Sequence, residues 1–165
     1  SKFNLIYRNN IKKENLSEII AFQKLCKKKN IKFFVANDLS KALRLNASGI
    51  YLSSYNKKFL NISKTLRKNF EIIGSAHNFS EINMKRKQGC ETVILSRLFK
   101  TDYKNKSTFL GTTRFNLMTK NLLKNFVALG GIKSKNLMKI NILNCEGIAL
   151  LSEAKKKPAI IRRLF

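Results

Sequence analysis

Residues 126–132 read FVALGGI, an apolar run that ends in two glycines. Successive apolar residues without polar alternation are typical of a strand buried on both faces of a parallel sheet. Gly130 and Gly131 allow a tight turn in which the backbone can approach a ligand closely. Residues 147–153, GIALLSE, are the next apolar run, and Ser152 and Glu153 follow that strand directly. Turns after the last two strands are where (β/α)₈ barrels hold phosphate, so this pair favours a barrel over an open doubly wound sheet.

The rest of the chain alternates between short apolar runs and longer helical patterns. This alternation predicts an α/β fold with a parallel sheet. Asn78 and Glu81 have the spacing of a capping box, which begins a helix that Gly89 ends. A second helix is predicted by apolar residues spaced for one buried face: Leu16, Ile19, Ile20, Phe22, Leu25 and Cys26. With one proline and no Gly/Ser-rich segment, we expect a single domain over residues 1–165. The predicted strands are residues 3–7 (FNLIY), 31–36 (IKFFVA), 49–52 (GIYL), 71–76 (EIIGSA), 92–95 (TVIL), 126–129 (FVAL) and 147–151 (GIALL).

The composition indicates a folded and strongly basic protein. Of 165 residues, 44% are hydrophobic, which is enough for a core and excludes wholesale disorder. The net charge of +25 favours polyanionic partners: nucleic acid, an acidic membrane surface or a phosphorylated small molecule. The basic residues are scattered over predicted helix faces, for example residues 27–29 (KKK) and 85–87 (KRK), and we expect a solvated surface there. Nucleic-acid binding is the less favoured alternative, because duplex binders gather their positive charge on one face.

The cysteine pattern and the N-terminal residues indicate in which cellular compartment the protein is expected. Cys26, Cys90 and Cys145 lie far apart and form no C-x-x-C pair, so neither a disulfide framework nor a zinc site is predicted. Residues 1–8 lack the apolar core of a signal peptide, and no apolar run approaches the roughly 20 residues that span a bilayer. We therefore expect a cytoplasmic protein without a membrane partner.

Six segments that overlap the predicted strands have the order and spacing of a known family: 5–8 (LIYR), 35–38 (VAND), 47–52 (ASGIYL), 73–77 (IGSAH), 95–101 (LSRLFKT) and 128–132 (ALGGI). The chain resembles the thiamine phosphate synthase and TenI family of small (β/α)₈ barrels, in a divergent form similar to an alphaproteobacterial branch. The resemblance implies a TIM-type barrel that lacks the family's first strand and helix and shows seven strands. An open barrel exposes unpaired strand edges, so we expect self-association into a homo-oligomer.

The resemblance also implies a reaction and a set of site residues. The reaction joins a hydroxymethylpyrimidine pyrophosphate to a thiazole phosphate, with Mg²⁺ as cofactor and phosphorylated small molecules as ligands. By position, Arg8, Asp38 and Lys104 are the implied catalytic residues, and Asp38 with Asn56 forms a weak metal site. Residues that match substrate-binding or phosphate-binding positions, or that follow the last two strands, are Asn37, Ser75, Thr101, Gly130, Gly131 and Ser152.

Several positions depart from the family pattern and keep alternatives open. Ile6 and Asn10 replace a Gln and a Lys, and Asn56 replaces a second magnesium-binding Asp, which lowers the expected affinity for Mg²⁺. Arg97 stands where TenI proteins carry a His, and a guanidinium cannot serve as a base at neutral pH, so a thiazole tautomerase is disfavoured. A catalytically degenerate relative that binds a phosphorylated ligand as a regulator or carrier is the alternative.

Each candidate residue also has a purely structural interpretation. Asp38 could cap the helix that follows it, and Gly130 and Gly131 could serve only as turn residues. His77 is the single histidine, and a lone His is more often a hydrogen-bonded structural residue than a catalyst.

Overall fold

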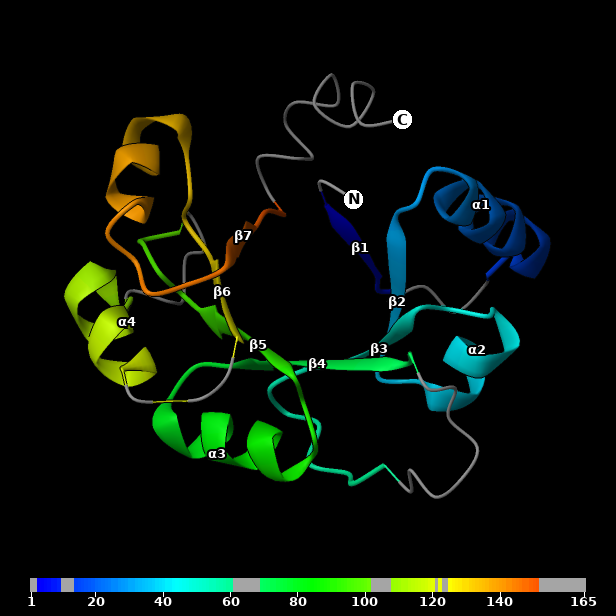
Figure 1. Cartoon of the computed structure of the whole chain (residues 1–165), viewed down its shortest axis with the longest axis horizontal. Helices are drawn as coiled ribbons and strands as arrows, with labels where there is room; N and C mark the ends of the chain where they lie inside the picture. The colour runs from blue at the N-terminus through cyan, green and yellow to red at the C-terminus, as the bar shows by residue number, and fades with distance from the viewer. Residues whose placement is uncertain are drawn as a thin grey trace.

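The strands of this computed structural model form one parallel sheet, curved into part of a barrel (Figure 1). The structure describes residues 3–9, 14–60, 69–101, 108–120, 122 and 125–151. Within them, seven strands pair in sequence order, from β1 at one edge to β7 at the other. The strands are β1 (Asn4–Tyr7), β2 (Lys32–Ala36), β3 (Gly49–Leu52), β4 (Glu71–Ala76), β5 (Thr92–Ser96), β6 (Asn125–Leu129) and β7 (Gly147–Ala149).

The predicted strands are confirmed in number, direction and place. Residues 49–52 and 71–76 are strands with the predicted bounds, whereas β7 ends two residues earlier than residues 147–151 would give. The incomplete barrel is thus the fold that the sequence predicts. The helices are α1 (Leu16–Lys28), α2 (Leu39–Arg44), α3 (Phe79–Lys87), α4 (Gly111–Thr119) and a 3₁₀ helix, η1 (Ser134–Ile140).

Alternate residues of each strand pack on opposite faces of the sheet. Ile72 and Val93 belong to the larger core, between the sheet and the helices that surround it in Figure 1. Their neighbours Ile73 and Ile94 belong to a second cluster, together with Phe34 and Tyr51, on the concave face. Because both faces are covered by apolar residues, the strands have the continuous apolar sequences typical of parallel sheets.

Two helices test the sequence predictions directly. Asn78 caps α3 as predicted, because its Oδ1 accepts a hydrogen bond from the Glu81 amide at 2.9 Å. The buried face of α1 differs from the prediction, since Phe22 and Leu25 are 38% and 39% exposed. Gln23 is buried instead, and its amide donates to the carbonyl oxygen of Asn46 at 3.1 Å. A polar side chain with a hydrogen-bond partner can therefore occupy a core position that the apolar pattern does not reveal.

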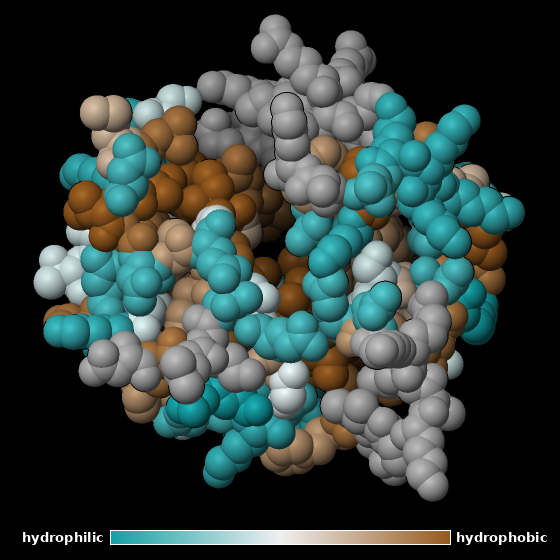
Figure 2. All heavy atoms as spheres, viewed as in Figure 1, coloured by the Kyte–Doolittle hydropathy of each residue, from teal (hydrophilic) through white to brown (hydrophobic). Residues whose placement is uncertain are grey.

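On the face seen in Figure 2, hydrophilic residues flank a hollow at the centre, and hydrophobic residues gather toward the upper left. Hydrophobic residues are visible deeper in that hollow. Among the described residues, no helix has both the length and the apolar character needed to cross a membrane.

Candidate functional site

Polar side chains follow the strands at their carboxyl ends. In a parallel sheet these ends meet at one edge, so residues far apart in the sequence come together there. The residues that lie at this edge are Arg8 after β1, Asn37 and Asp38 after β2, Ser53 to Asn56 after β3, His77 after β4, Arg97 after β5 and Gly130 after β6.

Asn37, Ser53 and Asn56 form a compact group that we call the Asn37 cluster. Oδ1 of Asn37 accepts three hydrogen bonds, from the Ser53 amide and the Ser53 hydroxyl, each at 2.9 Å, and from Nδ2 of Asn56 at 3.1 Å. The structure thus brings together Asn37 and Asn56, two residues predicted for the site. Because these donors occupy Oδ1 of Asn37, its Nδ2 amide is the end that can donate to an anionic ligand.

Asn37 has a left-handed backbone, with φ of 60°. Asparagine tolerates this conformation better than most residues. It redirects the chain between β2 and α2.

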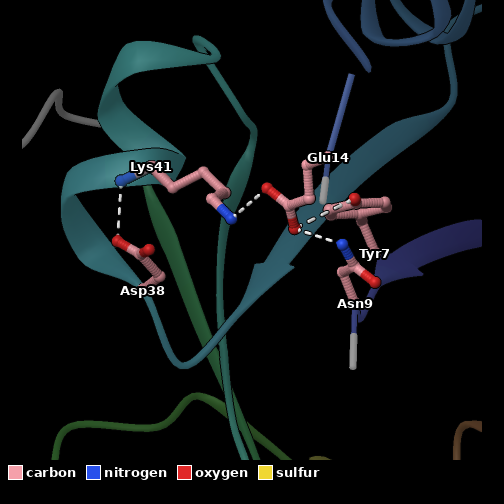
Figure 3. A network of polar contacts seen from close by, with 5 residues as sticks. All are labelled: Tyr7, Asn9, Glu14, Asp38 and Lys41. Atoms are coloured by element: carbon pink, nitrogen blue, oxygen red, sulfur yellow. Dashed lines mark hydrogen bonds and ion pairs between the residues drawn. The ribbon is translucent and has the colours of Figure 1, made fainter. Parts of the chain in front are cut away.

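Asp38 is the N-cap of α2, and its Oδ1 accepts a hydrogen bond from the Lys41 amide at 2.8 Å. The ammonium group of Lys41 lies 2.5 Å from Oε2 of Glu14, whose other oxygen accepts from Tyr7 and Asn9 (Figure 3). The hydrogen bond from Lys41, followed in size by the one from Asn9, lowers the pKa of Glu14. This network connects the end of β1 to the start of α2. Asp38 itself has the structural role of a helix cap, and its role in the site stays a prediction.

Arg8 is held at the rim by Tyr55. Its Nη2 donates to the Tyr55 hydroxyl at 2.9 Å, and its guanidinium carbon lies 5.9 Å from the centre of the tyrosine ring. Tyr55 is 66% exposed. The ion pairs within the described part of the chain are Lys32 with Glu71 and Lys41 with Glu14, so no described carboxylate neutralises the Arg8 charge. Arg8 is therefore positioned by a neutral side chain and keeps its attraction for an anion.

Two further pairs of polar residues join neighbouring strands near their carboxyl ends. The Tyr51 hydroxyl donates to Oγ of Ser75 at 2.8 Å, and both residues are buried. Because Ser75 accepts this bond, its own hydroxyl hydrogen is available to a ligand. Nδ1 of His77 lies 2.9 Å from the Ser96 carbonyl oxygen and 3.0 Å from its hydroxyl. A carbonyl oxygen only accepts, so we assign the ring proton to Nδ1, in a structural hydrogen bond of His77.

Gly130 and Gly131 pack against the loop that follows β5. Their φ angles are 104° and 66°, a region that favours glycine. A Cβ on Gly131 would lie 2.5 Å from the carbonyl oxygens of Phe99 and Lys100, so no side chain fits there. Close packing of two loops is thus one reason for these glycines, whatever ligand the turn also serves.

Thr101 follows the same loop, and its hydroxyl is buried without a hydrogen-bond partner. Such a group normally finds a partner, and a bound ligand would supply one. The predicted residues Lys104 and Ser152 lie outside the described residues.

Lys85 lies in the core and not on the solvated surface predicted for it. The prediction of a solvated 85–87 run is wrong at this position, because Lys85 is fully buried on α3. Its ammonium group donates to the carbonyl oxygens of Ser53 and Asn56, each at 2.7 Å, and to Oε1 of Gln88 at 2.8 Å. Burial lowers the pKa of Lys85 below its ordinary value, with Cys90 and Glu81 acting in the opposite direction. The sequence spacing could have indicated this burial, because Lys85 lies three residues after the buried Ile82 on the same face of the helix.

The comparisons with known proteins identify the family. The family model described as thiamine monophosphate synthase matches residues 4–154. The chain belongs to this family. A thiamine-phosphate synthase of Prochlorococcus marinus is 33% identical over 151 residues, which are 89% of this chain and 42% of the relative. The chain therefore spans less than half the length of that relative.

Two further similarities agree with the family match. "Thiamine-phosphate synthase 1" of Streptococcus pneumoniae is 29% identical over 142 residues, which are 84% of this chain and 67% of the relative. The solved structure of a thiamine phosphate pyrophosphorylase from Pyrococcus furiosus has a TM-score of 0.68 at 21% identity, and the match covers 93% of this chain and 79% of that one. This structural likeness supports the barrel fold that the sequence predicts.

Proposed function

We propose that this chain carries the catalytic barrel of a thiamine phosphate synthase. In the proposed reaction, the bond between the aminopyrimidine methyl carbon and the pyrophosphate oxygen breaks, and the electron pair leaves with pyrophosphate. The thiazole nitrogen then donates its lone pair to that carbon, forming the new C–N bond. The observation that carries the proposal is the family match over residues 4–154, in a chain whose matching polar residues meet at one edge of the sheet.

The leaving pyrophosphate needs positive charge and hydrogen-bond donors, and the β1 to β4 side of the site offers both. Arg8 supplies a charge that no described carboxylate neutralises. Nδ2 of Asn37 and the hydroxyl of Ser75 supply directed donors, because the other atoms of these groups are already bonded. Donors fixed before the reaction stabilise a developing anion more than mobile ones do. Lys104 remains a predicted contributor.

Of the three oxygen-bearing side chains Asn37, Asp38 and Asn56, only Asp38 has an oxygen available to bind Mg²⁺. Oδ1 of Asn56 accepts from the Lys58 amide at 3.0 Å, and Oδ1 of Asn37 already has three donors, so Asp38 offers the free carboxylate oxygen. The described residues contain no cluster of three or more His, Cys, Asp or Glu side chains suited to a metal. Mg²⁺ is often held by one or two carboxylates together with substrate phosphates and water, which fits Asp38 as the single protein ligand. When bound, the ion would neutralise charge on the pyrophosphate.

The thiazole phosphate would bind on the β5 to β7 side. The turn at Gly130 and Gly131 and the unpartnered hydroxyl of Thr101 support this assignment. Ser152, after β7, remains a prediction for the same phosphate. In this arrangement the two substrates enter from opposite sides of the mouth.

The test is formation of thiamine phosphate from both precursors. The purified chain is incubated with the pyrimidine pyrophosphate, the thiazole phosphate and Mg²⁺, and the product is separated and quantified. We expect product that disappears when a chelator removes the metal. Omission of either precursor is the control for carried-over thiamine.

A phosphate-ligand-binding protein without turnover is the second candidate. The observation in its favour is that Asn56, which replaces the second family carboxylate, already donates to Asn37 and accepts from the Lys58 amide. Binding of the thiazole phosphate without product formation, with both precursors and Mg²⁺ present, would select this candidate.

We also propose that copies of the chain associate in the cytoplasm. The support is that, within the described residues, the sheet ends at β1 and β7, since unpaired edges invite pairing with another strand. Light scattering on the purified chain over a range of concentrations tests this, and a monomer at all of them would contradict it.

A further inference from the structure

The loop after β3 is held from two opposite sides. We call residues 53–58 the β3 loop. On one side, Oδ1 of Asn37 accepts from Ser53 and Asn56. On the other, Lys85 of α3 and Gln88, the C-cap of that helix, donate from their side chains to backbone carbonyl oxygens of this loop. The loop is therefore fixed between the candidate site and α3, a helix that carries none of the predicted site residues.

The contacts from α3 are numerous and short. Lys85 donates to the carbonyl oxygens of Ser53 and Asn56, each at 2.7 Å. Gln88 donates to the carbonyl oxygens of Asn56 at 3.0 Å and Lys58 at 2.7 Å, and its own Oε1 accepts from Lys85. The three ammonium hydrogens of Lys85 thus have three acceptors, which compensates the cost of burying its charge.

The sheet is shaped to admit the Lys85 side chain. A Cβ on Gly74 of β4 would lie 2.7 Å from Cδ of Lys85 and 2.8 Å from the Cys90 sulfur. The lysine therefore passes over β4 at a position where the strand has no side chain. A buried apolar residue could fill the same space without desolvating a charge, so the hydrogen bonds to the loop are what this lysine adds.

The β3 loop carries the side chains that hold two ligand-binding candidates in place. Tyr55 accepts a hydrogen bond from Arg8, whose guanidinium lies over the tyrosine ring, and Asn56 donates to Asn37. A shift of the loop backbone would therefore move both residues at once. Displacements of about 1 Å at a binding group can reduce catalysis by about a hundredfold.

We propose that Lys85 and Gln88 are positioning residues that fix the β3 loop, and through it Arg8 and Asn37, for binding a pyrophosphate group. The identity of the ligand rests on the proposed function, whereas the effect on the loop does not. Neither side chain touches the ligand in this arrangement. Their contribution should appear on the pyrophosphate side of the site and leave the thiazole phosphate side unchanged.

The test compares three variants with the parent chain. Lys85→Met removes the ammonium group and keeps the length of the side chain, and Gln88→Met removes the second donor while keeping Lys85. Lys87→Met makes the same chemical change on the exposed face of α3 and is the matched control. Calorimetric titration with inorganic pyrophosphate in the presence of Mg²⁺ measures binding without any need for turnover. Hydrogen exchange of the β3 loop amides measures its order, and circular dichroism shows that each variant is folded.

We expect Lys85→Met and Gln88→Met each to weaken pyrophosphate binding about tenfold, because the loop loses its fixed position. Exchange in the β3 loop should be faster, and the KM for the pyrimidine pyrophosphate should rise while that for the thiazole phosphate stays constant. Lys87→Met should match the parent in every measurement. A lysine that only stabilised the fold would lower the melting temperature without separating the two KM values.

The outcomes separate this inference from the proposed function. If the parent binds pyrophosphate but forms no thiamine phosphate, the proposed function fails, and the binding and exchange data still decide the inference. Folded Lys85→Met and Gln88→Met chains that bind pyrophosphate as tightly as the parent overturn it. If Lys85→Met does not fold, Gln88→Met gives the decision alone. A parent chain that does not bind pyrophosphate also overturns the inference.

Discussion

The two sides of the barrel mouth are built by different means. On the β2–β3 side, side chains hold the loops: Asn37 accepts three hydrogen bonds there, and Lys85 donates three. On the β5–β6 side, the loops pack backbone against backbone, with the Phe99 amide donating to the carbonyl oxygen of Gly130 at 3.0 Å. Truncating one side chain removes one side-chain contact. A contact between two backbone segments is disturbed when a substitution adds atoms, as a Cβ at a glycine would. Substitutions should therefore act gradually on the first side and abruptly on the second.

The largest effect is expected from Gly131→Ala. The new methyl group would lie 2.5 Å from two backbone carbonyl oxygens, at a φ of 66° that disfavours alanine. We expect a loss of roughly 3 kcal/mol in unfolding free energy, from overpacking and backbone strain together. Urea denaturation measures this.

Two other glycines separate the two causes. Gly111 has a φ of 70° but open space at its Cβ, and Gly147 has open space and no positive φ. Gly111→Ala should cost about 1 kcal/mol from conformation alone, and Gly147→Ala should have little effect. Equal losses at all three positions would contradict the packing argument for Gly131.

The second prediction concerns Asp38, which has both a structural and a proposed catalytic role. Asp38→Ala removes the α2 cap and should cost about 1 kcal/mol of stability, and it should also abolish thiamine phosphate formation if Asp38 is the magnesium ligand. Asp38→Ser restores a capping hydroxyl without a carboxylate. We expect the serine variant to regain stability and remain inactive in a steady-state assay with Mg²⁺. A serine variant with full activity would reduce Asp38 to a helix cap.

Asn56→Asp tests whether a second carboxylate can join Asp38 as a ligand of Mg²⁺. A second carboxylate should strengthen the dependence of turnover on Mg²⁺ and raise activity, because a dication prefers two charged ligands. The structure adds a condition: the amide of Asn56 donates to Asn37, so Asn37 must turn its own amide toward the new carboxylate. Activity across a magnesium titration measures the effect, and an unchanged magnesium dependence would contradict it.

The sequence was sufficient for the fold and for part of the site. Strands such as 49–52 and 71–76 are predictable because residues buried on both faces of the sheet must be apolar. Asn37 and Asn56 were predicted separately, and their direct contact depends on a left-handed turn and a loop that no local pattern specifies. Lys85 was misplaced because the hydrogen bonds that permit its burial come from residues about 30 positions away in the sequence. The spacing of apolar residues along a helix does not reveal hydrogen bonds to residues so distant in the sequence.

A smaller effect is expected from Tyr51→Phe on the side-chain-held part of the mouth. The change removes the buried hydrogen bond to Ser75 and should cost about 1 kcal/mol of stability. The Ser75 hydroxyl would then lose its fixed orientation, and the KM for the pyrimidine pyrophosphate should rise by a small factor. Steady-state kinetics and thermal melting test both statements. An unchanged KM together with the stability loss would restrict the Tyr51–Ser75 pair to a structural role.

The smallest effect concerns the pH dependence of the Glu14 network. Hydrogen bonds from Lys41 and Asn9 lower the pKa of Glu14 below its ordinary value of 4.5. A carboxylate with a lowered folded-state pKa contributes stability that is complete above the unfolded-state value and is lost as the pH falls through the folded-state value. The parent should therefore melt at a slightly higher temperature than Glu14→Gln at neutral pH. This difference should shrink below pH 4.5 and vanish in more acidic solution. Glu91→Gln makes the same change at an exposed carboxylate and is the control. A melting difference for Glu14→Gln that persists in acid would show that packing, and not charge, joins β1 to α2.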